Sequence, residues 1–272
     1  MITFNNIGRL GGLGNQMFQY ASLKGIARHH GYDFATPPRD IFIEDASMYL
    51  TPVSKDIYWW KMSTHLYDCF GLDKKNEVGL FPNKVLMERM HNFDEELFNK
   101  CPDNVDIFGY YQTPKYFNHI EDELRDDFTF DEELKSSCGD FISEDMISLH
   151  IRRGDYVNNP NHPIPSFDYY EEALSKLPPN IPAIVFSDDY EWVKEQSFFK
   201  PDRFSIAEGN TTDADLCLMS LCKYHIIANS SFSWWGAWLA NSEKIIAPKK
   251  WFGGDSVNKN VDDMVFGDWS WI

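Results

Sequence analysis

Two adjacent arginines in the middle of the chain form the part of the sequence best suited to holding an anion. They lie in the heptapeptide His150-Ile151-Arg152-Arg153-Gly154-Asp155-Tyr156, which follows an apolar run. Guanidinium groups are planar and always charged, so they bind phosphate or carboxylate oxygens with paired donors. The alternative is a solvated surface turn, because short charged patterns of this kind often have no ligand.

Hydroxyl groups gather near the end of the chain, where an apolar run gives way to Asn229-Ser230-Ser231-Phe232-Ser233. Serine side chains and the free N–H groups of a helix start both donate to phosphate oxygens. Together with the arginine pair, these groups would provide the positive charge and the hydrogen-bond donors that a diphosphate needs. The serines are also good helix N-caps, so a purely local role is the alternative for each of them.

The acidic stretch Asp213-Ala214-Asp215 has the DxD spacing with which many sugar-nucleotide enzymes hold a divalent metal ion. Because the two arginines already offer positive charge, we expect no obligatory metal. The carboxylate of Asp215 can instead accept hydrogen bonds from the N1–H and N2–H₂ edge of guanine. Alternatively, Thr212 and Asp215 form only a capping box at the start of a helix.

A glycine-rich segment near the start of the chain follows a predicted strand, Ile2–Ile7. It precedes a helical pattern from Asn15 to Ala27. Gly14 and Asn15 stand where a helix start can receive an anion, and glycines let a backbone approach a ligand closely. The spacing matches neither the dinucleotide fingerprint nor the GxxxxGK[ST] phosphate loop. Tight packing alone is the alternative role of these glycines.

Strands and helices alternate from Met146 onward. The predicted strands are Ile147–Ile151, Ala183–Phe186, Phe204–Ile206, Tyr224–Ala228 and Ile245–Ala247. This alternation implies a parallel sheet with helices on both faces. Because ligands bind at the carboxyl ends of such strands, we expect the arginine heptapeptide, Ser187–Asp189 and the serine-rich stretch to converge. Asp188 and Asp189 are otherwise ordinary turn or cap residues.

The region from residue 32 to residue 145 is less informative. Val105–Tyr111 is a predicted strand, and Pro114–Asp127 is predicted to begin a helical, acidic segment. The pairs Trp59-Trp60 and Tyr110-Tyr111 could stack on sugar faces, with core packing as the alternative. A chain of 272 residues favours either two domains or one large α/β unit.

Composition limits the partners and the compartment. A formal net charge of −17 argues against general nucleic-acid binding, because affinity for the phosphate backbone needs clustered cations. The five cysteines include no CxxC pair, which argues against a disulfide framework and a zinc site. No apolar run approaches the ~20 residues of a membrane-spanning helix, and no signal-peptide pattern opens the chain. We therefore expect a cytoplasmic protein.

Three motifs together resemble the signatures of the α-1,2-fucosyltransferases, family 11 of the glycosyltransferases. They are the glycine-rich motif Gly11-Gly12-Leu13-Gly14-Asn15-Gln16-Met17-Phe18-Gln19-Tyr20-Ala21, the arginine heptapeptide, and Asn229-Ser230-Ser231-Phe232-Ser233-Trp234-Trp235-Gly236-Ala237-Trp238-Leu239. Each motif alone is weak evidence. Their order and spacing cover nearly the whole chain, which makes the set specific.

The resemblance implies an α/β fold of GT-B type, with two Rossmann-like domains facing across a cleft. We expect residues 1–142 to form mainly the acceptor side and residues 143–272 to bind GDP-fucose. The implied reaction is inverting transfer of L-fucose to the 2-hydroxyl of a terminal β-galactoside, without a cofactor or an obligatory metal. The partners would be GDP-fucose and a galactose-terminated glycan. From the resemblance we also expect peripheral association with the inner membrane, where lipid-linked glycans are built.

The same resemblance assigns residue roles. Arg152 matches the arginine on the donor's β-phosphate, His150 and Asp215 match guanine contacts, and Ser231 matches a phosphate contact. Asn15 matches the glycine-loop asparagine near the fucose and the diphosphate. The other substrate-binding candidates in these motifs are Gly14, Arg153, Ser230 and Phe232.

The leaving group would be GDP, so negative charge builds on its β-phosphate as the glycosidic bond breaks. Arg152 would stabilise that charge more in the transition state than in the ground state, which is what catalysis requires. Asp155 is the local candidate for a general base, although it can instead orient Arg152 or Arg153. The rival class is a non-catalytic glycan- or nucleotide-binding protein, which the same basic and aromatic residues would suit.

Overall fold

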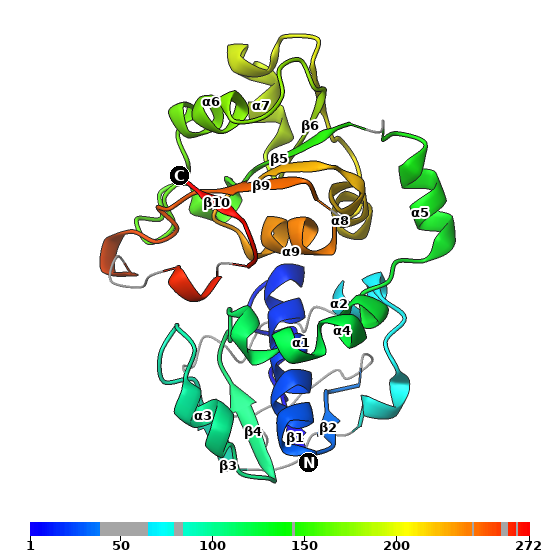
Figure 1. Cartoon of the computed structure of the whole chain (residues 1–272), viewed down its shortest axis with the longest axis vertical. Helices are drawn as coiled ribbons and strands as arrows, with labels where there is room; N and C mark the ends of the chain where they lie inside the picture. Colours follow the sequence, from blue (N-terminus) through cyan, green and yellow to red (C-terminus); the bar gives the residue numbers. More distant parts are fainter. Residues whose placement is uncertain (39–64, 79–83, 143–144, 241, 257–260, 265) are drawn as a thin grey trace. The chain divides into compact units, whose positions relative to one another are not determined.

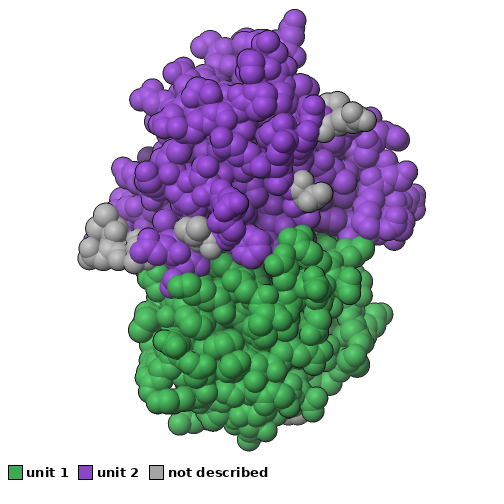
Figure 2. Space-filling model, in the orientation of Figure 1, with its two compact units in different colours: residues 1–129 green, residues 130–272 purple. Residues whose placement is uncertain are grey.

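The chain folds into two compact units, residues 1–129 and residues 130–272 (Figure 2). The structure is a computed structural model that describes residues 1–38, 65–78, 84–142, 145–240, 242–256, 261–264 and 266–272 (Figure 1). The pair Trp59-Trp60, considered above for sugar stacking, lies outside the described residues.

Unit 1 is built on a four-stranded sheet with the order β2-β1-β4-β3, in which all neighbouring strands are parallel. Its strands are β1 (Ile2–Thr3), β2 (Phe34–Ala35), β3 (Lys84–Met87) and β4 (Val105–Phe108). The predicted strand Ile2–Ile7 is therefore too long. The chain turns after β1 because the backbone N–H of Asn5 donates to the Asp106 carboxylate, and Ile7 donates to the carbonyl of Phe4.

Helix α1 (Leu13–His30) is the central helix of unit 1, and every residue from Gln16 to Ala27 is buried. It begins at Leu13, ahead of the predicted start at Asn15, so Gly14 and Asn15 belong to its first turn. Gly31 ends the helix with φ +68, a left-handed conformation that glycine adopts without a steric penalty. The glycine-rich loop therefore ends at Gly12, the N-cap of α1.

The other helices of unit 1 are short. They are α2 (His65–Cys69), α3 (Glu95–Lys100) and α4 (Glu121–Asp127), with 3₁₀ turns at η3 (Lys74–Asn76), η4 (Pro114–Tyr116) and η5 (Asn118–Ile120). The helical segment predicted to begin at Pro114 is interrupted at Phe117, which is fully buried and has φ −138. This segment packs closely on α1: a Cβ added to Gly25 would lie 2.1 Å from the Tyr116 carbonyl oxygen.

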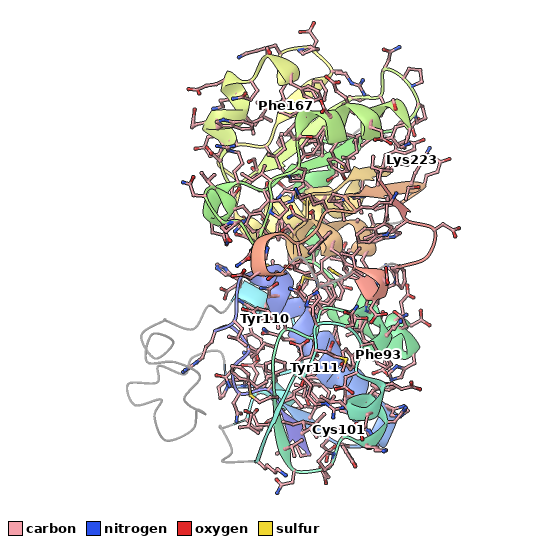
Figure 3. The ribbon with its side chains drawn as sticks, turned by 90° about the vertical axis from the view of Figure 1, so that its left-hand side faces the viewer. Phe93, Cys101, Tyr110, Tyr111, Phe167 and Lys223 are labelled. Carbon is pink, nitrogen blue, oxygen red and sulfur yellow. The ribbon has the colours of Figure 1, made fainter. Side chains whose placement is uncertain are left out.

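Tyr110 and Tyr111 follow β4 and have different environments (Figure 3). Tyr111 is fully buried, with edge-to-face contacts to Phe4 at 5.9 Å and Tyr116 at 5.3 Å between ring centroids. Tyr110 is 44% exposed. Core packing therefore accounts for Tyr111 but not for Tyr110.

Unit 2 contains a six-stranded, fully parallel sheet with the order β10-β9-β8-β5-β6-β7, which confirms the alternation read from the sequence. The strands are β5 (Ile147–Ile151), β6 (Ala183–Ser187), β7 (Phe204–Ile206), β8 (Tyr224–Ile226), β9 (Lys244–Ala247) and β10 (Ser270–Trp271). Ile147, Leu149 and Ile151 of the inner strand β5 are at most 2% exposed.

Helices cover both faces of this second sheet. Figure 1 shows α6 (Phe167–Ser175) and α7 (Tyr190–Glu195) on one face, and α8 (Thr212–Leu221) and α9 (Ser231–Leu239) on the other. Short 3₁₀ turns complete the unit at η6 (Gly154–Tyr156), η7 (Ser197–Phe199), η8 (Gly254–Ser256) and η9 (Asp262–Met264).

Helix α5 (Glu132–Gly139) belongs to unit 2 by its contacts. It packs on α8, where the Sγ of Cys138 lies 3.8 Å from the carbonyl oxygen of Ala214. The domain boundary predicted from the sequence, after residue 142, would place α5 in the first domain instead.

All five cysteines are free and buried. Within the described parts of the chain, no helix combines the length and apolarity needed to cross a membrane.

Candidate functional site

Arg152 lies just beyond the carboxyl end of β5 and is held by two carboxylates. Its Nη2 is 2.5 Å from Oδ1 of Asp155, and its Nη1 is 3.0 Å from Oδ2 of Asp188. The Arg152 side chain is 32% exposed, so its guanidinium is fixed in orientation yet reachable from solvent. Asp155 therefore orients Arg152 here, which is one of the two roles open to it from the sequence.

Asp188 contacts the backbone of the arginine turn as well as the Arg152 guanidinium. Its Oδ1 accepts a hydrogen bond of 2.9 Å from the backbone N–H of Arg153. A Cβ added to Gly154 would lie 2.1 Å from its Oδ2, so only glycine leaves room for this carboxylate. The sequence placed Asp188 at the right strand end but gave no reason to prefer this role over an ordinary turn.

The Arg153 side chain contacts helix α7 and its N-cap residue. Its Nε donates to Oδ2 of Asp189 at 2.9 Å, and its guanidinium carbon lies 3.7 Å from the centroid of the Trp192 ring. Asp189 is also the N-cap of α7 and accepts from the Trp192 backbone N–H. The structure therefore gives the two neighbouring arginines different surroundings, with Arg153 only 17% exposed.

His150, the last-but-one residue of β5, is 4% exposed. Burial, and secondarily the charge of Arg152, lower its pKa to about 3, so the imidazole is neutral at physiological pH. Its Nδ1 is buried without a hydrogen-bond partner among the described residues. The ring lies 5.9 Å from that of Phe232, which brings two of the predicted site residues together.

The serine-rich stretch forms the start of α9. Ser230 is its N-cap and accepts from the backbone N–H of Phe232 at 3.3 Å, and Ser233 donates to the Ala228 carbonyl at 3.4 Å. Ser231 is the first helical residue and is partly exposed. The Tyr156 hydroxyl donates to the Asn229 carbonyl at 2.9 Å, so this stretch and the arginine turn are in direct contact.

Asp215 lies in the first turn of α8. The predicted capping box is wrong, because the helix already begins at Thr212 and its N-cap is Thr211. Asp215 Oδ1 accepts from the side-chain amide of Asn210 at 2.9 Å, and burial raises the pKa of its carboxyl group. In the described part of the chain, no group of three His, Cys, Asp or Glu side chains could hold a metal ion.

The glycine loop of unit 1 carries Asn15, whose side chain folds back over Gly11. A Cβ added to Gly11 would lie 2.0 Å from Nδ2 of Asn15, and Gly11 has φ +95. Gln112, beyond the end of β4, donates from Nε2 to Oδ1 of Asn15 at 2.7 Å. No local pattern indicates Gln112, because its partner lies 97 positions away along the chain.

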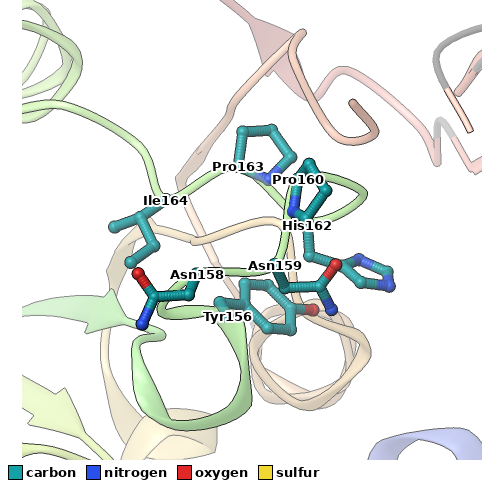
Figure 4. Close-up of a pocket in the computed structure, with 7 residues that line it drawn as sticks. All are labelled: Tyr156, Asn158, Asn159, Pro160, His162, Pro163 and Ile164. Atoms are coloured by element: carbon teal, nitrogen blue, oxygen red, sulfur yellow. The ribbon is translucent and has the colours of Figure 1, made fainter. Parts of the chain in front are cut away.

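A surface hollow adjoins the arginine turn (Figure 4). Its volume is about 350 Å³. The lining residues are Tyr156, Asn158, Asn159, Pro160, His162, Pro163 and Ile164. The rings of Tyr156 and His162 are stacked with centroids 4.8 Å apart, and the Arg152 guanidinium lies 5.5 Å from the Tyr156 ring. Apart from Tyr156, these residues were not singled out from the sequence.

Comparison with known proteins identifies relatives over nearly the whole chain. An α-1,2-colitosyltransferase of Escherichia coli is 35% identical, over 91% of this chain and 92% of that protein. Galactoside α-(1,2)-fucosyltransferase 2 of Sus scrofa is 25% identical, over 90% of this chain and 71% of that protein. The solved structure of fucosyltransferase NodZ from Bradyrhizobium has a TM-score of 0.54 at 16% identity, covering 88% of this chain and 93% of that one.

The likeness to NodZ concerns the fold, and it confirms the predicted α/β architecture of GT-B type. The family follows from the sequences. A sequence model described as Glycosyl transferase family 11 matches residues 1–272, and the relative from E. coli is similar over nearly the full length of both chains. The chain therefore belongs to glycosyltransferase family 11.

Proposed function

We propose that this family 11 glycosyltransferase moves L-fucose from GDP-fucose to the 2-hydroxyl of a terminal β-galactoside, with inversion at the anomeric carbon. The observation that carries the proposal is the fixed yet accessible guanidinium of Arg152 at the carboxyl end of β5, in a turn that contacts the start of α9. Such an arrangement suits a leaving diphosphate. The linkage and acceptor are proposed from the names of the relatives in E. coli and Sus scrofa.

Unit 2 is proposed to bind the nucleotide. Arg152 would contact the β-phosphate, and Ser231 would add its hydroxyl at the helix start, where the helix dipole also favours an anion. His150 supports a base-recognition role because it presents a neutral, buried ring whose Nδ1 lacks a partner among the described residues. Asp215 would accept from guanine, and Phe232 packs beside His150. Asn15 of unit 1 would contact the fucose and the diphosphate.

Catalysis would consist mainly of stabilising the leaving group. The acceptor oxygen forms a bond to the anomeric carbon while the bond from that carbon to the β-phosphate oxygen breaks. The bonding electrons pass to the phosphate, and Arg152 stabilises the resulting charge. Asp155 is the proposed receiver of the hydroxyl proton. Its side chain is 67% exposed, and exposed ion pairs are weak, so a phosphate can displace it from Arg152 at little cost.

We further propose that the reaction needs no metal ion, because Arg152 supplies positive charge where a metal would bind the diphosphate. The test is incubation with GDP-fucose and lactose in the presence of EDTA, followed by mass spectrometry and linkage analysis. Fucosyl-α-1,2-lactose is the expected product. Nucleotide binding without product would favour the non-catalytic binding protein, and product only after addition of Mg²⁺ would contradict metal independence.

A second donor follows from the colitosyltransferase name of the E. coli relative. GDP-colitose should therefore be tested beside GDP-fucose with the same acceptors. A larger kcat/KM with GDP-colitose would replace fucose in the proposal while leaving the roles of Arg152 and Asp215 unchanged.

A further inference from the structure

Arg9, in the glycine-rich loop of unit 1, is a buried cation without a counter-charge among the described residues. It is only 9% exposed, and its Nε is buried with no hydrogen-bond partner in the described part of the chain. Burial lowers the pKa of its guanidinium, and no carboxylate of the described residues offsets this effect. The group still carries its charge, because arginine is not deprotonated in proteins.

Lys24 shows how the same unit accommodates a buried cation that has partners. Its side chain is 7% exposed, and its Nζ lies 2.6 Å from Oδ2 of Asp127 and 3.3 Å from Oε2 of Glu123. A charge is buried at much lower cost when an opposite charge pairs with it. Within the described residues, Arg9 lacks the compensation that Lys24 has, and a bound anion would provide it.

The backbone that follows Arg9 also favours an anion. Gly12 is the N-cap of α1 and offers no capping side chain, and the first turn of the helix contains no acidic residue. Free N–H groups and the helix dipole give the start of this 18-residue helix a partial positive charge. A glycine-rich loop that leads into a helix start is a recurrent phosphate-binding arrangement.

We propose that Arg9 is the centre of an oxyanion site in unit 1 that takes a phosphate-type anion on its guanidinium. The planar group suits phosphate oxygens because it offers paired donors in a fixed geometry. The proposed function gives Arg9 no role, and the site does not depend on which donor or acceptor the enzyme uses. The anion is either free phosphate or a phosphate group of a nucleotide.

The first test measures the Tm of Arg9→Met, in which a neutral, unbranched side chain replaces the arginine. In phosphate-free buffer its Tm should exceed that of the wild type by at least about 2 °C, because an uncompensated charge is removed. Lys24→Met is the matched control. Its Tm should fall below that of the wild type, since it breaks the ion pair with Asp127. Arg9→Lys keeps the charge, so its Tm should stay closer to that of the wild type than the Tm of Arg9→Met does.

The second test replaces potassium chloride with potassium phosphate at equal ionic strength. Phosphate should raise the Tm of the wild type by at least about 2 °C more than that of Arg9→Met, because an anion that binds only the folded state stabilises it. Phosphate also stabilises proteins in general through its exclusion from their surfaces. That general effect is common to both proteins and cancels in the comparison.

Calorimetric titration with GDP and with guanosine distinguishes the two sources of the anion. If the phosphate belongs to the nucleotide, Arg9→Met should weaken GDP binding by on the order of tenfold and leave guanosine binding unchanged. If the anion is free phosphate, both proteins should bind GDP equally. Phosphate should then still raise the Tm of the wild type when GDP is saturating.

The proposal is overturned if phosphate and GDP act alike on the wild type and on Arg9→Met. It is equally overturned if Arg9→Met lowers the Tm in phosphate-free buffer as Lys24→Met does, because Arg9 would then already be paired in the ligand-free protein. None of these measurements requires turnover. Failure of the proposed fucosyl transfer would therefore leave the result for Arg9 unchanged.

Discussion

The two arginines of the heptapeptide differ in what holds them, and this difference separates their roles. Arg153 stacks on Trp192 and pairs with Asp189, so its charge joins the turn to α7. Arg152 pairs with Asp155, which is 67% exposed, and with Asp188, which is 25% exposed. Since exposed pairs contribute only ~0–1 kcal/mol, Arg152 can exchange Asp155 for a phosphate without unfolding anything around it.

Arg152→Ala should lower kcat for fucosyl transfer by about 10²–10³-fold, because a preorganised donor to the leaving phosphate is lost. Arg152→Lys should recover little of the rate, since an ammonium group cannot reproduce the planar fork that Asp155 and Asp188 hold. Steady-state kinetics provide the measurement, with the thermal midpoint as the check on folding. Near-normal turnover by the alanine variant would remove Arg152 from the mechanism.

At the scale of elements, the site is made by the ends of neighbouring parallel strands. β5 and β8 pair directly, with Leu149 opposite Ile226, and the loops beyond them meet through the Tyr156 hydroxyl and the Asn229 carbonyl. β6 lies on the other side of β5 and delivers Asp188. This is the expected behaviour of a parallel sheet, whose carboxyl ends lie at one edge.

The turn after β5 depends on the absence of a side chain at Gly154. In Gly154→Ala the new Cβ would lie 2.1 Å from Asp188 Oδ2 and would force that carboxylate away from Arg152. We expect kcat to fall by roughly tenfold or more, as a charge-assisted contact is lost. Gly139→Ala, where nothing lies within 4 Å of the added Cβ, is the matched control.

The same substitution tests the role of Asp188. In an Asp188→Ala background, Gly154→Ala should add little further loss of kcat, because the carboxylate it displaces is already gone. Full additivity of the two changes would show that Gly154 acts through some contact other than Asp188.

For the whole molecule, sequence periodicity predicted only part of the regular structure. Strands β5 to β9 of unit 2 were predicted because buried parallel strands are continuous apolar runs separated by helical patterns. β10 of unit 2 and β2 and β3 of unit 1 were not predicted. The helical segment predicted from Pro114 is present as η4, η5 and α4, but it is interrupted at the buried Phe117. The capping box failed because α8 begins earlier than the motif suggests.

The candidate site likewise has residues that local motifs indicate and contacts that only the folded chain reveals. Arg152 and Ser231 could be proposed from the sequence because charge, glycine and hydroxyl groups concentrate within short motifs. Asp188 and Gln112 make their hydrogen bonds across 35 and 97 positions of sequence, to Arg153 and Asn15 respectively. Contacts of that kind exist only in the folded chain, so no local pattern could have indicated them.

Each unit has a buried ionisable residue whose pKa shift makes stability depend on pH, and the two dependences have opposite signs. In unit 1, burial raises the pKa of Asp106 to about 6, although Thr3 and Asn5 donate to its Oδ1. The stability this carboxyl contributes is present at low pH and is lost as pH rises through 6. In unit 2, burial lowers the pKa of His225 to about 4. Its contribution is present above the unfolded value near 6.5 and is lost as pH falls.

Hydrogen exchange, corrected for intrinsic rates, should therefore show β4 of unit 1 better protected at pH 5 than at pH 8, and β8 of unit 2 the reverse. Each shift is on the order of 3 kcal/mol when complete, because one pKa unit corresponds to ~1.4 kcal/mol. Asp106→Asn should weaken the response of unit 1 and leave that of unit 2 unchanged. His225→Gln should weaken the response of unit 2 without abolishing it, because the buried His150 responds to pH in the same direction. If either variant kept the pH response of the wild type, other ionisable groups would control the stability of that unit.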